Sequence, residues 1–195
     1  MPIICIEGPP AAGKTTAALE LEDRYGAYVV PETPFQQGES SWNQCVNQVE
    51  RWRQALEKSG QYAVVVLDGD IFAPLVYASL WKDAVSLQQL NEHFQSVFLE
   101  QKIGLPDHYV YLYASPATRQ KRMAGGRGVQ REIPAETHHR YYTRFLQRIP
   151  TSMQEIRAGH EETAAREIMR KLSPIPEHRY EIQSFQCMQN ILRQV

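Results

Sequence analysis

The sequence predicts an α/β fold in which helices cover both faces of a five-stranded parallel sheet. Short apolar runs alternate with segments of helical periodicity along the 195 residues, and this order is typical of a parallel sheet. The most apolar run, 61–70, lacks the polar alternation of a half-exposed strand, which favours burial on both faces. A glycine-rich turn joins the first apolar run to a helical segment. We expect a single domain over residues 1–195.

The first half of the chain supplies three of the strands. The apolar run 2–7 ends at Gly8, and the helical segment 13–26 ends at a second glycine, Gly26. A strand at 27–32 stops at a proline. A long helix at 42–60 then leads to the strand at 61–70.

The second half repeats the alternation. Helical patterns over 72–103 precede a fourth strand at 107–116, which a short helix follows at 116–123. The segment 124–134 is irregular and rich in glycine, and helices are expected within 135–172. A fifth strand is expected at 178–184, before a terminal helix.

Composition and charge narrow the classes of function. The net charge of −1 gives no basic surface for nucleic acid or for an anionic membrane. The three cysteines are scattered and lack metal-ligand spacing, which favours a reducing compartment over a disulfide framework. No signal peptide or membrane-length apolar segment is visible. We expect a cytoplasmic protein whose partner is a small molecule.

The glycine-rich turn carries the most specific motif. Residues 8–15, GPPAAGKT, match G-x-x-x-x-G-K-[ST] and lie between a predicted strand and a predicted helix. Small residues let the backbone approach an anion, so that N–H groups at a helix N-terminus converge on phosphate oxygens. The motif predicts ATP and Mg²⁺ as cofactors, with the lysine on the β- and γ-phosphates and the first threonine on the metal. The predicted nucleotide-binding residues are Gly8, Ala11, Ala12, Gly13, Lys14, Thr15 and Thr16.

Carboxylates follow two further predicted strands. Glu32 ends one, and Asp68 and Asp70 end another. Ligands of parallel α/β sheets bind beyond the carboxyl ends of the strands, so these acids are expected beside the phosphate loop. Either Glu32 or Asp68 could accept the proton of an attacking hydroxyl, and Asp68 could also help to hold Mg²⁺.

A basic, glycine-rich segment follows the fourth strand. Residues 119–132 concentrate arginines around three glycines, which favours a flap that neutralises charge on a transferring phosphoryl group. We expect a lid over about 122–133, with Arg122 and Arg127 on the phosphates. Arg119 and Lys121 are expected to face solvent.

These features, taken in order, resemble the deoxynucleoside kinase family, and thymidylate kinases share the same plan. The resemblance rests on the phosphate loop, VVPETP, DGDIFA and YLYASPATRQKRMAGGRG. It implies a P-loop NTPase fold, kinase activity on a nucleoside or nucleotide, and a possible homodimer. It also implies that Glu32 is the base and that Arg122 and Arg127 contact phosphate.

By the same resemblance, the helix over 42–58 forms the wall of the acceptor site. Gln44, Gln48, Arg51 and Trp52 share one face of it, although Trp42 and Trp52 are also interpreted as core anchors. Further candidates for the acceptor site are Phe35, Asp70, Phe72 and Tyr77. His138 and His139 lack metal-ligand spacing and are expected on a helix surface.

One departure from the family pattern leaves the acceptor open. The family has aspartate-arginine where this chain has Asp68-Gly69-Asp70, so an arginine expected near the substrate is missing. This pattern is similar to that of kinases acting on adenylylsulfate, and an antibiotic is a further alternative acceptor. A third alternative is an ATP-binding regulatory module, which the arginine flap and the carboxylates argue against.

Overall fold

The computed structural model describes residues 1–33, 39–124, 134–148, 152–157, 163–172 and 178–194. Within them, five strands form one sheet in the order β2-β3-β1-β4-β5, and every neighbouring pair is parallel. The strands are β1 (Ile3–Glu7), β2 (Tyr28–Val30), β3 (Val65–Asp68), β4 (His108–Tyr113) and β5 (Ser152–Arg157). The predicted α/β class and five-stranded parallel sheet are confirmed.

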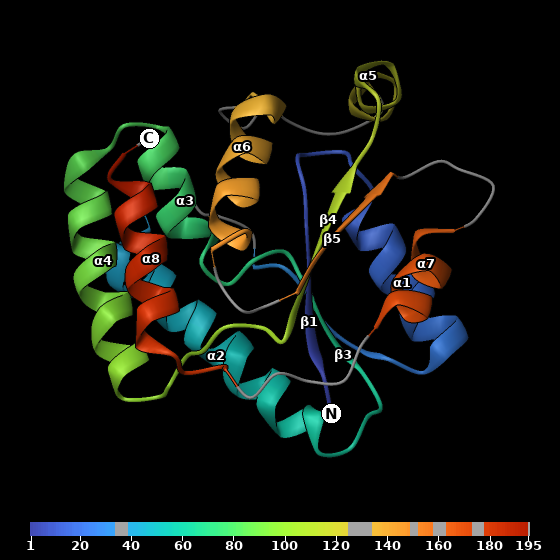
Figure 1. The fold of residues 1–195 in the computed structure, drawn as a ribbon, viewed down its shortest axis with the longest axis horizontal. Coiled ribbons are helices and arrows are strands. Elements are labelled where there is room, and N and C mark those ends of the chain that lie inside the picture. The colour runs from blue at the N-terminus through green and yellow to red at the C-terminus, as the bar shows by residue number, and fades with distance from the viewer. Residues whose placement is uncertain (34–38, 125–133, 149–151, 158–162, 173–177, 195) are drawn as a thin grey trace.

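Helices connect the strands and cover both faces of the sheet (Figure 1). They are α1 (Lys14–Tyr25), α2 (Ser41–Ser59), α3 (Ala73–Leu80), α4 (Ala84–Leu99), α5 (Pro116–Ala124), α6 (Ala135–Leu146), α7 (Ala164–Lys171) and α8 (Ile182–Leu192). None of the helices in the described part of the chain is long and apolar enough to cross a membrane.

The sheet separates two hydrophobic layers. In β1, Ile3 and Cys5 point into one layer, whereas Ile4 and Ile6 point into the other, because successive strand side chains alternate between faces. Helices α1 and α7 cover the smaller layer, and α2, α3, α4, α6 and α8 cover the larger one (Figure 1). These four apolar side chains of β1 are fully buried, which accounts for the continuous apolar run in the sequence.

The carboxyl ends of three adjacent strands bring acids to one edge of the sheet. β1 ends at Glu7, and β3, which pairs beside it, ends at Asp68. β2 lies on the other side of β3 and is followed by Pro31 and Glu32. The phosphate loop and α5 lie at this same edge (Figure 1).

The predicted position of the fifth strand is wrong. The strand is β5, which pairs along its length with β4 and lies in the region expected to be helical. The segment around Arg179 is instead tied to Asp107, whose two carboxylate oxygens accept from the Arg179 guanidinium at 2.8 and 2.7 Å. Helix α8 begins directly afterwards. β5 is an edge strand with exposed Glu155 and Arg157, so its apolar signal in the sequence is weak.

Candidate active site

The loop between β1 and α1 has the backbone shape of an anion-binding turn. A Cβ on Gly8 would lie 2.1 Å from the Leu112 carbonyl oxygen, so only glycine fits beside β4. Ala11 and Gly13 have φ angles of 62° and 107°, and residues of this kind turn neighbouring N–H groups toward a common point. Helix α1 starts at Lys14 with no side chain capping its N-terminus. The loop therefore offers main-chain N–H groups to an anion, and phosphate binding stays a prediction.

A buried carboxylate lies behind this loop. Glu7 is 2% exposed, and its two oxygens accept from the main-chain N–H groups of Gly8 and Asp70 at 2.7 Å each. Lys14 Nζ lies 3.7 Å from the same carboxylate and donates to the Gly8 carbonyl oxygen. Glu7 thus fixes the loop and the turn after β3 to each other. This role of Glu7 was not predicted, although a glutamate at the end of an otherwise apolar strand was a signal in the sequence.

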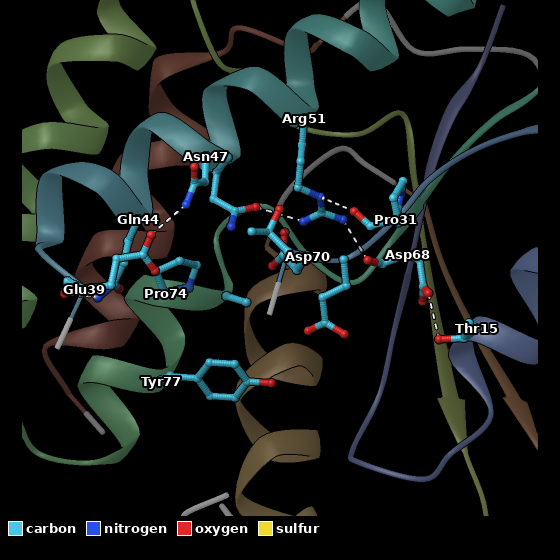
Figure 2. A pocket seen from close by; sticks show the side chains of 14 residues that line it. Thr15, Pro31, Glu39, Gln44, Asn47, Arg51, Asp68, Asp70, Pro74 and Tyr77 are labelled. Carbon is cyan, nitrogen blue, oxygen red and sulfur yellow. Dashed lines mark hydrogen bonds between the residues drawn. The ribbon is translucent and has the colours of Figure 1, made fainter. Parts of the chain in front are cut away.

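Thr15 and Asp68 connect the loop to β3. The Thr15 hydroxyl donates to Asp68 Oδ2 at 2.7 Å (Figure 2). The other oxygen, Asp68 Oδ1, is buried and accepts no hydrogen bond from the described residues. A hydroxyl and an uncommitted carboxylate oxygen form an all-oxygen set of the kind that holds Mg²⁺ beside nucleotide phosphates. These two side chains therefore fit the predicted metal.

Helix α5 places two arginines against the loop. Arg119 Nε donates to the Pro10 carbonyl oxygen at 3.0 Å, and Arg122 Nη1 donates to the carbonyls of Ala11 and Ala12 at 2.9 Å each. The expectation that Arg119 faces solvent is wrong, because its guanidinium packs on the loop, whereas Lys121 is exposed as expected. The predicted lid beyond 124, including Arg127, lies outside the described residues.

A cavity of about 410 Å³ opens between the loop, the strand ends and α2. This volume is within the range of small-molecule sites. The predicted residues that line it are Thr15, Glu32, Gln44, Gln48, Arg51, Asp68, Asp70 and Tyr77. Figure 2 shows Thr15 and Asp68 at one end and Glu39 at the other, with Tyr77 facing the space between them.

The Glu32 carboxylate lies over Gly69. A Cβ on Gly69 would come 3.2 Å from the Glu32 carboxyl carbon, and Gly69 has a φ angle of 82°. The glycine therefore leaves room for Glu32. The surrounding protein shields the Glu32 carboxylate from water, and this desolvation raises its pKa above the usual glutamate value. The Lys14 ammonium opposes the rise, and the Glu7 carboxylate adds to it. Glu32 keeps contact with solvent in the cavity.

The guanidinium of Arg51 on α2 donates all its hydrogen bonds in the described residues to groups in and beside the cavity wall. Its Nε donates to the Pro31 carbonyl oxygen at 2.9 Å, and its Nη2 donates to the Asp68 carbonyl oxygen at 2.7 Å (Figure 2). The same Nη2 also donates to the Gly69 carbonyl oxygen at 2.9 Å. Its Nη1 donates to Gln48 Oε1 at 2.8 Å. Arg51 thus fastens the ends of β2 and β3 to α2.

Asp70 is held by tyrosines from two elements. The Tyr142 hydroxyl donates to its Oδ2 at 2.9 Å, and the Tyr109 hydroxyl and the Phe72 N–H donate to its Oδ1 at 3.2 and 3.1 Å. Burial raises the pKa of Asp70 to about 6, Glu7 adds to the rise, and these hydrogen bonds oppose it. Asp70 therefore connects α6 to the cavity floor.

His138 is buried, which corrects the expected surface position. It is 2% exposed, and its Nδ1 lies 2.8 Å from the Tyr111 hydroxyl. Burial lowers the pKa of His138 to about 4, so the ring is neutral at neutral pH. His139 does lie at the surface, 3.1 Å from Glu155. The tyrosine partner of His138 could not be predicted from the sequence, because Tyr111 lies 27 residues away on β4.

Some predicted acceptor residues lie elsewhere. Phe72 and Trp52 are fully buried in the larger hydrophobic layer and do not reach the cavity lining. For Trp52 the core interpretation is confirmed, whereas Trp42 is 51% exposed and is no core anchor. Phe35 lies outside the described residues.

Comparisons with known proteins were made on sequence and on structure. No protein-family model matches the chain, and a search of the curated proteins finds no match. Among solved structures, deoxyadenosine kinase from M. mycoides with bound dATP aligns with a TM-score of 0.59 and 17% identity, covering 88% of this chain and 98% of that one. Thymidylate kinase from Candida albicans aligns with a TM-score of 0.52 and 15% identity, covering 96% and 93%. The chain has the fold of these kinases.

Proposed function

We propose that the chain is a kinase that transfers the γ-phosphoryl group of ATP to a hydroxyl group of a nucleoside. One observation carries this proposal: a single cavity reaches from Thr15 of the phosphate loop to the carboxylates Glu32 and Asp68. A donor site and a proton acceptor then face the same space, as phosphoryl transfer requires. The shared fold with deoxyadenosine kinase and thymidylate kinase supports a nucleoside or nucleotide as substrate.

The phosphate loop would hold the triphosphate. N–H groups of residues 11–16 bind its oxygens, and Lys14 moves from the Gly8 carbonyl to the β- and γ-phosphates. Bound Mg²⁺, held by Thr15 and Asp68, would neutralise charge on the phosphate oxygens. Arg122 and Arg127 would neutralise more of it, and Arg119 would keep α5 on the loop.

Glu32 is the proposed base, because Asp68 already accepts from Thr15. The acceptor hydroxyl oxygen bonds to the γ-phosphorus as the bond from phosphorus to the β,γ-bridging oxygen breaks, and ADP leaves with that electron pair. The hydroxyl proton passes to the Glu32 carboxylate. The raised pKa of Glu32 makes it a better acceptor of that proton than an ordinary glutamate.

ATP consumption over a panel of nucleosides, nucleoside monophosphates and unrelated alcohols tests the proposal. The expected result is turnover that depends on an added nucleoside and is lost with Lys14→Ala. Turnover confined to unrelated alcohols would contradict the nucleoside assignment. ATP binding without acceptor-dependent turnover would contradict the kinase assignment and favour a regulatory module.

A further inference from the structure

The end of the cavity away from the phosphate loop is formed by a carboxylate that α2 holds in place. Glu39 precedes the N-cap residue of α2 and lines the cavity. Asn47 Nδ2 donates to Glu39 Oε1 at 2.7 Å, and Gln44 Nε2 donates to the Glu39 main-chain oxygen at 3.1 Å (Figure 2). Both the backbone and the side chain of Glu39 are therefore positioned before any ligand binds.

The second oxygen of Glu39 is available to a ligand. Oε2 accepts no hydrogen bond from the residues that the structure describes, whereas Oε1 is taken by Asn47. A carboxylate oxygen only accepts hydrogen bonds, so its complement is a nitrogen that donates them.

Gln48 adds a second hydrogen-bonding group to the cavity, independent of Glu39. It is 6% exposed, and because a guanidinium can only donate, its bond to Arg51 fixes Oε1 toward that residue and leaves Nε2 as the uncommitted end. Nε2 has no acceptor within the described ranges, and Gln48 lines the cavity. A ligand in the cavity can therefore accept a hydrogen bond from this amide. The wall thus offers one donor and, farther along, one carboxylate acceptor.

The charge of the lining disfavours an anionic acceptor. Four carboxylates line the cavity, Glu32, Glu39, Asp68 and Asp70, and Arg51 is the one cation among the described lining residues. The Arg51 guanidinium already donates to three carbonyls and to Gln48. A phosphate or sulfate on the acceptor would meet net negative charge with no uncommitted cation in this lining.

We propose that Glu39 is a specificity residue for an acceptor that carries a hydrogen-donating nitrogen at the end opposite its reacting hydroxyl. Such a nitrogen is an exocyclic amino group of a nucleobase or a protonated amine. The proposal rests on the proposed kinase function and narrows its substrate class. Figure 2 shows Glu39 at one end of the cavity and Thr15 with Asp68 at the other, so one acceptor molecule could contact both ends.

Matched acceptor pairs test it. The full-length enzyme is assayed with MgATP and deoxycytidine against deoxyuridine, deoxyadenosine against deoxyinosine, and glucosamine against glucose. The amino member of at least one pair is expected to have a kcat/KM about tenfold higher or more, because its nitrogen donates a hydrogen bond to the charged carboxylate and the oxo member cannot. Preference in the nucleoside pairs identifies an exocyclic amino group, and preference in the sugar pair identifies an ammonium group.

The variant Glu39→Gln, with Glu57→Gln on the exposed face of α2 as control, tests the residue itself. Glu39→Gln should lower the amino-to-oxo ratio of kcat/KM about tenfold or more, mainly through KM, while Glu57→Gln leaves the ratio unchanged. Nucleoside turnover with oxo members or monophosphates preferred, or a ratio unaffected by Glu39→Gln, overturns the inference and leaves the kinase proposal standing. The absence of any acceptor-dependent turnover overturns both.

Discussion

The phosphate loop and the acceptor cavity differ in what they are made of. The loop is built from consecutive residues between β1 and α1, and its chemistry is that of main-chain N–H groups and one lysine. The cavity wall is built from side chains of β3, α2, α3 and the segment that follows β2, which are far apart in the sequence. The motif that predicts phosphate binding can therefore be recognised in a short stretch of sequence, whereas the residues proposed to select the acceptor come together only in the tertiary structure.

Glu7 and Arg51 join the two regions. Glu7 binds the N–H groups of Gly8 in the loop and of Asp70 beyond β3. Arg51 binds carbonyls at the ends of β2 and β3 from the acceptor side. The reacting ends of both substrates would therefore be held by one hydrogen-bonded framework, which is the positioning that phosphoryl transfer depends on.

The largest effect is expected in the loop. Lys14→Ala removes the cation proposed for the β- and γ-phosphates, and kcat should fall about 10³–10⁵-fold, the range known for an arginine finger, which is another cation that contacts the transferred phosphoryl group. Steady-state kinetics measures it, with the exposed Lys102→Ala as the matched control. Retention of parental activity by Lys14→Ala would remove the loop from the mechanism.

Substitutions at Glu32 and Asp68 distinguish the proposed base from the proposed Mg²⁺ ligand. Glu32→Gln should lower kcat about 10²–10⁴-fold, whereas Asp68→Asn should mainly raise the Mg²⁺ concentration needed for half-maximal activity. Because the pKa of Glu32 is raised and its ionised form is the active one, kcat should rise with pH above the usual glutamate range. Glu32→Gln should abolish that rise in the pH profile. If Asp68→Asn instead abolishes it, Asp68 is the base.

Asp70 should make stability depend on pH. Its pKa is raised from 3.8 to about 6 by burial, so the native state binds the proton more tightly than the unfolded state, and stability falls as pH rises through this interval. Asp70→Asn cannot ionise. The free energy of unfolding of the variant, relative to the parent, should increase by about 3 kcal/mol between pH 3 and pH 7.

Urea unfolding across this pH range measures that difference, with the exposed Asp23→Asn as control. A difference between Asp70→Asn and the parent that does not change with pH would show that Asp70 titrates normally. Ionisation of Asp70 would then not change the free energy of unfolding.

The smallest expected effect is on stability, when Gly69 and Gly60 are each replaced by alanine. Gly69→Ala places a Cβ at a φ angle of 82° and 3.2 Å from the Glu32 carboxyl carbon, whereas a Cβ on Gly60 meets its nearest atom at 3.7 Å. Gly69→Ala should cost about 1–2 kcal/mol of stability and displace Glu32, lowering kcat. Gly60→Ala should be near neutral. Equal melting temperatures for both variants would show that the turn after β3 relaxes freely.

The sequence predicted the parts of the fold whose signals are local. The strand-helix alternation, the loop motif and Gly26 placed β1 and α1 correctly. β5 was missed because exposed Glu155 and Arg157 flank buried Ile156, which leaves a weak apolar signal. The segment around Arg179 was wrongly predicted as a strand, because its contact with Asp107, 72 residues away, cannot be read from local sequence. Pairing partners far apart in sequence leave no trace in local periodicity.

The candidate site shows the same division. Glu32, Asp68 and Asp70 were predictable because acids at strand ends meet at one edge of a parallel sheet. Phe72 was misplaced because side-chain direction after a strand end depends on the following turn, and it packs into the core. Glu39 was missed because its role depends on amides from the first turns of α2.

A crystal structure of the chain with Mg²⁺ and a nonhydrolysable ATP analogue would show whether the loop and the cavity bind one nucleotide as proposed. The triphosphate is expected on the main-chain N–H groups of residues 11–16, the metal on Thr15 and Asp68, and the γ-phosphate facing Glu32 across the cavity. A nucleotide bound away from this loop, or a γ-phosphate pointing out of the cavity, would contradict this proposal.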